Sequence, residues 1–164
     1  MEVDIETLGA TEQQDAAFAK VLRCASAAEQ SSLKMRKKLS DAGFSSDAIE
    51  FALQKAQRVG AIDDVRYAEC LVRSHALAGK GMEFAKREVA ALGLDIDDLE
   101  AYQAYQDAGE HAHIEAAYDI LSRHPIRARD ARAAAFRKLL AKGYRGDIAS
   151  KAVSLWMEQR DNGV

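Results

Sequence analysis

The amino-acid sequence predicts an all-α fold made of three tandem three-helix repeats that form an elongated, curved rod. Three observations lead to this prediction. The chain matches itself at an offset of fifty residues, its apolar side chains recur every three or four positions, and turn-forming residues are scarce. The 164 residues include 10 glycines and a single proline, which is few for a β-sandwich or barrel.

The fifty-residue offset aligns four sets of identical residues. These sets are Arg23, Arg73 and Arg123; Ala28, Ala78 and Ala128; Gly43, Gly93 and Gly143; and Asp47, Asp97 and Asp147. The offset is constant, so the units carry no insertions relative to one another. We therefore expect a flexible acidic lead at residues 1–11 and three-helix repeats at residues 12–62, 63–112 and 113–164.

Each repeat contains three apolar stripes with helical spacing. In the first repeat they run through Ala17, Val21 and Cys24, then Met35, Leu39 and Ala42, then Ile49, Leu53, Ala56 and Val59. The second repeat has Tyr67 and Leu71, Ala85 and Val89, Leu99 and Tyr102; the third has Ile114, Ala117 and Leu121, Ala135 and Leu139, Ile148, Ala152 and Leu155. Gly43 marks the end of a helix, because glycine adopts the left-handed conformation at little cost.

Composition places the chain in the cytoplasm. No apolar stretch approaches the roughly 20 residues that cross a bilayer, and the acidic start lacks the features of a secretory signal. Two cysteines, Cys24 and Cys70, are too few for a disulfide framework, and we expect both to be small buried residues on helices. We expect a cytoplasmic monomer.

The net charge of -3 conceals a marked segregation of charge. Residues 12–62 carry 8 basic and 6 acidic side chains, residues 63–112 carry 5 and 11, and residues 113–164 carry 10 and 6. The outer repeats are thus basic and the middle one acidic, which favours a protein partner of mixed charge over uniform coating of a polyanion.

Basic side chains recur at equivalent positions, notably Lys37, Arg87 and Arg137 on the second helix of each repeat. Such a row could meet a periodic acidic surface, or it could be a solvated face near helix C-termini, where cations are favoured. The candidate partner-binding residues are Arg23, Arg36, Lys37, Lys38, Arg66, Arg73, Lys80, Lys86, Arg87, Arg123, Arg132, Arg137 and Lys138.

Nothing in the sequence indicates an enzyme, a cofactor, a metal site or a small-molecule substrate. His111 and His113 are two residues apart, which does not place them on one helix face, and we interpret the pair as a chance occurrence in a loop. Asp63 and Asp64 precede the Tyr67 helix and are expected to cap it. No serine stands in a nucleophile elbow.

Other motif-like segments also fail to support catalysis or sequence-specific DNA reading. Asp95, Asp97, Asp98 and Glu100 start a helix without the spacing of a calcium loop, and Gly79-Lys80-Gly81 lacks the strand of a phosphate loop. In a helix-turn-helix reader the helix after the turn contacts DNA. Here the helices after Gly43 and Gly93 begin with acidic residues, which would face phosphates unfavourably.

Three segments together resemble the RecX regulators of the bacterial recombinase RecA. They are Leu39–Phe44 with Asp47, Ile49, Ala52 and Leu53; Gly60–Glu69 continuing through Arg73 to Gly79–Gly81; and Arg137–Leu140 with Gly143, Tyr144, Asp147 and Ile148. The middle segment is the most diagnostic. The likeness runs over about residues 16–157, with the three units in register.

This resemblance implies tandem three-helix repeats and binding to RecA filaments on single-stranded DNA, along the filament groove. It implies inhibition of recombinase and co-protease activity by occupancy, as part of DNA repair, recombination and the SOS response. The chain departs from the family pattern at Ser31–Met35, at Met82 and Glu83, and at Ala90 and Leu92. Because the middle repeat is so acidic, we expect contact with the recombinase itself, and only indirect or weak contact with single-stranded DNA. A helical adaptor for another cytosolic protein and a non-specific DNA-binding protein are the alternatives.

Overall fold

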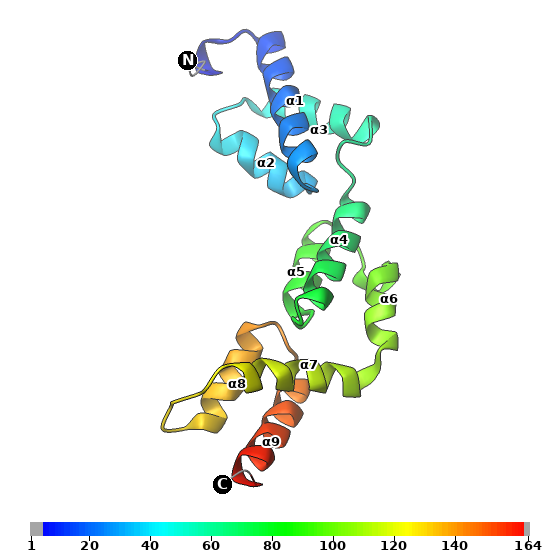
Figure 1. Ribbon diagram of the computed structural model, residues 1–164. Coiled ribbons are helices and arrows are strands. Elements are labelled where there is room, and N and C mark those ends of the chain that lie inside the picture. The colour runs from blue at the N-terminus through cyan, green and yellow to red at the C-terminus, as the bar shows by residue number, and fades with distance from the viewer. Residues whose placement is uncertain (1–4, 163–164) are drawn as a thin grey trace. The chain divides into compact units, whose positions relative to one another are not determined.

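The computed structural model describes residues 5–162, which form nine α-helices and two short 3-10 helices with no strand (Figure 1). In chain order they are η1 (Ile5–Thr7), α1 (Ala10–Ala27), α2 (Ser32–Asp41), α3 (Ser46–Arg58), α4 (Asp64–Leu77), α5 (Glu83–Ala91), η2 (Ile96–Asp98), α6 (Glu100–Asp107), α7 (Gly109–Arg123), α8 (Ala131–Ala141) and α9 (Gly146–Asn162). The chain divides into two compact units, residues 1–67 and 68–164. Among the described residues, no helix is long and apolar enough to span a membrane.

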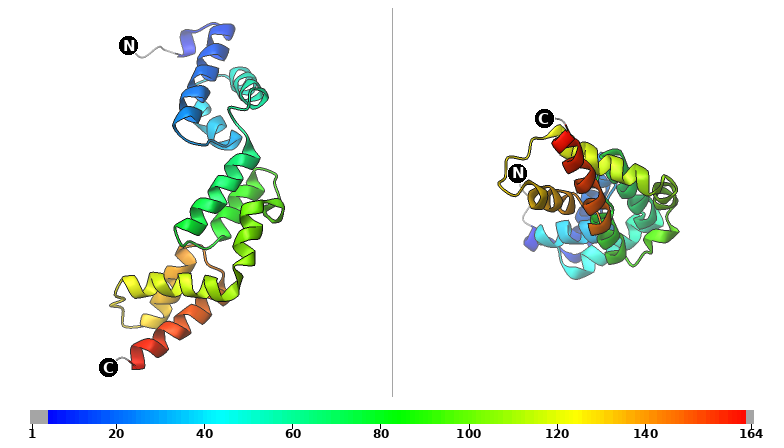
Figure 2. Two further views of the ribbon diagram at one scale, coloured as in Figure 1. Left: turned by 45° about the vertical axis from the view of Figure 1, so that its right-hand side comes forward. Right: turned by 90° about the horizontal axis from the view of Figure 1, so that it is seen from below.

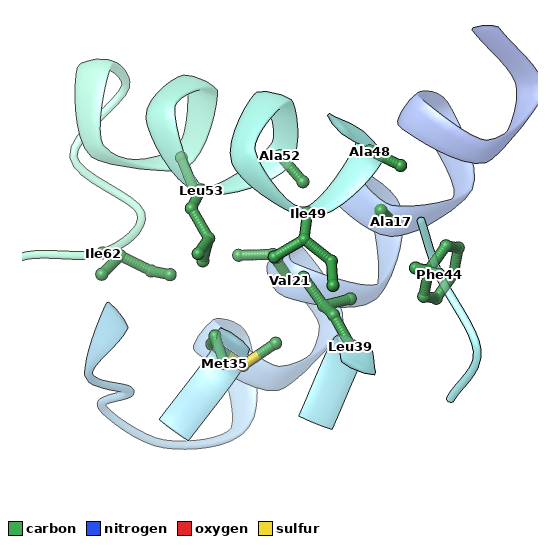
Figure 3. Packing of buried hydrophobic residues seen from close by; sticks show 11 residues of the cluster. Ala17, Val21, Met35, Leu39, Phe44, Ala48, Ile49, Ala52, Leu53 and Ile62 are labelled. Carbon is green, nitrogen blue, oxygen red and sulfur yellow. The ribbon is translucent and has the colours of Figure 1, made fainter. Parts of the chain in front are cut away.

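The first unit has one core, between α1, α2 and α3. Val21 from α1 lies between Ile49 of α3 and the side chains Met35 and Leu39 of α2 (Figure 3). Ile62, which follows α3, packs into the same cluster. The predicted stripes are buried except at their ends: Cys24 and Ala42 are half-buried, and Val59, which follows α3, is exposed.

The second unit has two cores. One joins Ala68 and Val72 of α4 to α5 and α6, and the other joins α7, α8 and α9, with Leu121 and Leu139 fully buried. In Figures 1 and 2, α7 and α9 cross against one another beside α8. The unit thus consists of two small bundles in sequence.

The fifty-residue repeat is visible in the burial pattern and in the backbone. Met35, Ala85 and Ala135 are all fully buried on the second helix of a triplet, and so are the residues four positions later, Leu39, Val89 and Leu139. Gly43, Gly93 and Gly143 end these three helices with φ of 86°, 76° and 85°. The all-α class and the three-helix repeats are confirmed, and the elongated, curved rod stays a prediction.

The proposed repeat limits also stay predictions. The limit between residues 62 and 63 falls just before α4, whereas the limit between 112 and 113 falls inside α7. Within the expected acidic lead, residues 1–4 lie outside the described residues, Ile5 packs against the first core, and α1 already begins at Ala10.

Residues 60–67 attach the start of α4 to the first three helices. Asp63 accepts a hydrogen bond from the backbone of Arg66 at 3.0 Å, which confirms its capping role. Asp64 instead serves a different helix: its carboxylate accepts from the backbone N–H (2.7 Å) and the hydroxyl (2.5 Å) of Ser32, the first residue of α2. A carboxylate at this end complements both the open amides and the helix dipole.

The two bundles of the second unit meet where their backbones touch, at a pairing of Gly79–Met82 with Lys142–Tyr144 that we call the clasp. The N–H of Gly81 donates to the carbonyl of Lys142 (3.1 Å), the N–H of Glu83 to that of Gly143 (3.0 Å), and the hydroxyl of Tyr144 to that of Gly79 (2.5 Å). A Cβ on Gly81 would overlap the backbone of Gly143 and Tyr144. The Gly79-Lys80-Gly81 segment is therefore a packing joint, and a side chain at position 81 is sterically excluded.

Beside the clasp lies a cavity of about 170 Å³ with an aromatic lining. Tyr105 stacks on His113 with ring centroids 3.9 Å apart, and Nε2 of His113 lies 2.8 Å from the Tyr105 carbonyl, to which it donates. Burial raises the pKa of the Tyr105 hydroxyl to about 12 and raises that of Tyr144 as well.

Two expectations for single residues are corrected by the structure. His111 and His113 were expected in a loop, but both lie on α7, because the helix starts directly at Gly109. His111 forms a pair with Glu115 at 3.2 Å and His113 stacks on Tyr105, so they point to different neighbours. Cys24 and Cys70 lie on helices as expected but are only half-buried.

Asp64→Ala should destabilise the first unit, because it leaves an amide at the start of α2 without its acceptor. We expect a loss of about 1–2 kcal/mol in the free energy of unfolding, measured by urea denaturation. Asp41→Ala is the matched control, since it removes only an exposed pair with Lys37 (2.7 Å) and should cost about 0.5 kcal/mol or less. Equal small losses for the two variants would contradict the role of Asp64.

The raised pKa of Tyr105 predicts alkaline weakening of the second unit. A tyrosine whose pKa is raised in the folded state favours folding below its ordinary pKa of 10, and that contribution is lost as the pH rises towards about 12. Tyr105→Phe keeps the ring and removes the titrating hydroxyl, so stability should depend less on pH across this window. Unfolding curves collected between these two pH values test this; identical slopes for the two proteins would count against it.

Candidate partner-binding surfaces

The thirteen predicted basic residues all lie in the described part of the chain. The first unit carries Arg23 on α1, Arg36, Lys37 and Lys38 on α2, and Arg66 on α4. The second unit carries Arg73 on α4, Lys80 in the clasp, Lys86 and Arg87 on α5, Arg123 on α7, and Arg132, Arg137 and Lys138 on α8. They separate into side chains that hold the fold together and side chains that face solvent.

Arg66 and Lys86 are engaged within the fold. The guanidinium of Arg66 donates to Glu29 at 2.6 Å and to the carbonyl of Gly60 at 3.2 Å, so it helps to attach α4 to the first unit. The ammonium of Lys86 lies 3.5 Å from Glu83 and 5.4 Å above the ring of Tyr102. A partner would have to displace these contacts to use either charge.

Arg36 has a carboxylate partner at the surface. Its ion pair with Glu50, between α2 and α3, lowers the pKa of that carboxyl through a side-chain hydrogen bond. Arg145, outside the predicted set, likewise pairs with Asp147 and lowers the pKa of its carboxyl to about 2. Both pairs are therefore fully charged at neutral pH.

Three further cations pair with a carboxylate one helical turn away. These pairs are Lys37 with Asp41 (2.7 Å), Arg73 with Glu69 (3.3 Å) and Arg123 with Asp119 (3.8 Å). The pairs of Lys37 and Arg123 are exposed and worth little, so a partner could recruit these two cations at small cost, whereas the Glu69 side chain is only 15% exposed. Glu69 has a second task, because its carboxylate accepts from the amides of Glu100 and Ala101 at the start of α6.

Two of the remaining predicted cations donate hydrogen bonds to neutral side chains, and the others form no ion pair with the described residues. Lys38 donates to Gln30 at 2.9 Å and Arg132 to Ser154 at 2.9 Å. Within residues 5–162, no ion pair is formed by Arg23, Lys80, Arg87, Arg137 or Lys138.

The recurring set Lys37, Arg87 and Arg137 is exposed in all three triplets. Each residue follows a fully buried position by two, which turns it by about 200° around its helix and away from its own core. Equivalent helices thus present a cation in the same way, and Arg87 and Arg137 do so within one unit. This arrangement suits repeated contacts with an extended acidic partner.

The sequence interpretation named Arg132 but missed two arginines that lie near it. Arg129, Arg132 and Arg160 line a hollow between the start of α8 and the end of α9, together with Asp130 and Asp161. Arg160 also lies 5.4 Å above the ring of Trp156. The spacing of the arginines between residues 123 and 132 could have drawn attention to the loop, but the contribution of Arg160 depends on the packing of α9.

No group of metal-ligating side chains occurs within residues 5–162. The acidic residues before α6 cap local backbone: Asp95 accepts from the N–H of Asp97 at 3.0 Å.

Comparison with known proteins identifies relatives by sequence. The chain is 32% identical over 85 residues to two proteins named "Regulatory protein RecX" from Legionella pneumophila, one of them from strain Corby. It is 35% identical over 95 residues to a protein of the same name from Stenotrophomonas maltophilia (strain R551-3). These matches cover 52% and 58% of this chain and only 57% and 56% of the relatives' own length. No protein-family model matches the chain.

Solved structures share the fold. RecX from Lactobacillus salivarius superimposes with a TM-score of 0.62 at 19% identity, over 90% of this chain and 99% of the other. A second crystal structure, of the regulatory protein RecX, gives a TM-score of 0.59 at 21% identity, over 90% of this chain and 76% of the other. The chain is therefore similar in sequence to RecX proteins over about half of their length, and it shares the fold of the two solved RecX structures.

Proposed function

We propose that this chain is a non-catalytic regulator that binds filaments of a RecA-type recombinase on single-stranded DNA. It acts in the cytoplasm as a monomer, lies along the filament groove, and restrains recombinase and co-protease activity by occupancy. The relatives' name, that of a regulatory protein, supports this proposal. So does the described surface, which presents charges suited to a large partner.

The observation that carries the proposal is the equivalent display of Lys37, Arg87 and Arg137 on α2, α5 and α8. A filament repeats the same protomer surface, so a protein that repeats the same cation can contact successive protomers. Linked weak contacts raise overall affinity through effective concentration without any single strong site.

Direct contact with single-stranded DNA is a second candidate, favoured by the hollow lined by Arg129, Arg132 and Arg160. Arginine clusters neutralise phosphates, and such binding weakens steeply as salt rises. The acidic residues of the middle triplet oppose a DNA path over the whole chain, so this contact would be confined to the third triplet.

The proposal predicts inhibition at less than one molecule per recombinase protomer. Recombinase ATPase activity on single-stranded DNA should fall when the chain is added sub-stoichiometrically, because one bound molecule affects several protomers. Unchanged ATPase activity together with no detectable binding to the filament would contradict it.

The cation row is tested by Lys37→Glu, Arg87→Glu and Arg137→Glu combined. Filament affinity should fall by about tenfold or more, since like charges then oppose the acidic partner. The matched control combines Lys20→Glu, Arg58→Glu and Lys151→Glu, which changes net charge equally on α1, α3 and α9. Circular dichroism should show unchanged helicity for both. Equal losses of affinity for the two triple variants would indicate a general charge effect and contradict a specific row.

A further inference from the structure

The clasp places two exposed apolar residues next to one backbone corner, at Gly143. Phe84, at the start of α5, lies with its ring against Gly143, and its side chain is 42% exposed. Leu140 lies in the last turn of α8, where its carbonyl accepts from the N–H of Gly143 at 3.0 Å, and it is 39% exposed. The two residues come from different helix triplets, and both border Gly143, which the clasp holds against Gly81.

Two arginines flank this apolar pair. The guanidinium of Arg87 lies 5.7 Å above the ring of Phe84. Arg137 precedes Leu140 by three residues, which makes it a neighbour on the surface of α8. We call Phe84, Arg87, Arg137 and Leu140 the clasp patch.

The composition of the clasp patch is that of a binding hot spot. Aromatic residues and arginine are enriched where protein interfaces derive most of their energy, and a central apolar anchor with a polar rim is the usual arrangement. Neither arginine is paired with a carboxylate in the part of the chain that the structure describes. The patch therefore combines an apolar centre with two unneutralised positive charges.

We propose that the clasp patch is the main docking point for a protein segment that carries an apolar side chain next to carboxylates. The apolar side chain packs between Phe84 and Leu140, and the carboxylates pair with Arg87 and Arg137. The inference rests on the proposed function, since it places that segment on the recombinase filament. The inference goes beyond the proposed function because it assigns the contact to one surface, built from two helix triplets, and to apolar anchors.

The glycine at position 81 has an indirect role in this surface. It makes no contact with a partner, but its missing side chain allows Gly143 to approach and so holds Phe84 beside the end of α8. Position 81 is accordingly a positioning residue for the clasp patch.

The test measures equilibrium binding of the full chain to recombinase filaments assembled on single-stranded DNA, and to the naked DNA alone. Phe84→Ala with Leu140→Ala should lower filament affinity by about tenfold or more. Leu22→Ala with Val59→Ala is the matched control, because it also removes two exposed apolar side chains (40% and 62%), and it should change affinity by less than about twofold. Equal affinities of the clasp-patch variant and the unaltered chain would overturn the inference.

The second arm distinguishes the occupant. If the double variant loses affinity for naked single-stranded DNA as strongly as for the filament, the patch is a stacking surface for bases and the protein segment is overturned. If the unaltered chain itself fails to bind filaments, the proposed function fails and this inference fails with it. If the clasp-patch variant loses filament binding and the control variant keeps it, both the proposed function and this inference are supported.

The positioning role of Gly81 is tested by a change that leaves the patch residues in place. Gly81→Ala should keep the helical circular dichroism signal and lower filament affinity by about tenfold, whereas Ala78→Gly, nearby and exposed, should not. If Gly81→Ala loses helicity, the test uses Tyr144→Phe instead. That change removes only the hydrogen bond from Tyr144 to Gly79 and should weaken filament binding by about two- to threefold. Unchanged affinity in the folded variant would overturn the positioning role.

Discussion

The second unit depends on a place where two backbones approach too closely for any side chain to lie between them. Gly81 presents its N–H to the carbonyl of Lys142, and the next turn continues with Glu83 to Gly143. Hydrogen bonds between main-chain groups of different bundles fix both distance and register, whereas apolar packing alone would tolerate sliding. The cavity lined by Tyr105 and Tyr144 lies beside this joint, and the joint also holds Phe84 against Gly143 at the end of α8.

Most of the fold could be predicted from the sequence because its determinants are local and repeated. The apolar positions at 35, 85 and 135 and at 39, 89 and 139 are buried as their spacing indicates. The three helices that carry them, α2, α5 and α8, each end at a glycine with positive φ. What could not be predicted were contacts between elements far apart in the chain. Asp64 looked like a cap for its own helix, but its carboxylate reaches Ser32, thirty-two residues earlier.

The candidate surface was only partly accessible from the sequence, because charge can be read from residue types but pairing cannot. Arg66 and Arg137 look alike in sequence, yet the first is tied to Glu29 and the second has no ion pair among residues 5–162. Phe84 and Leu140 follow no periodic pattern that marks them as exposed. Their significance appears only when the clasp brings α5 beside the end of α8.

The joint between the bundles also bears on how such an array can be duplicated. Fifty residues after Gly81 stands Ala131, whose methyl group would collide with an opposing main chain held as closely as that of Gly143. The fifty-residue repeat therefore does not extend to this joint, and with alanine at position 131 the third bundle cannot form the same backbone contact with a neighbour. The Cβ atom of Ala131 thus distinguishes the third bundle from the second, in which Gly81 permits this backbone contact.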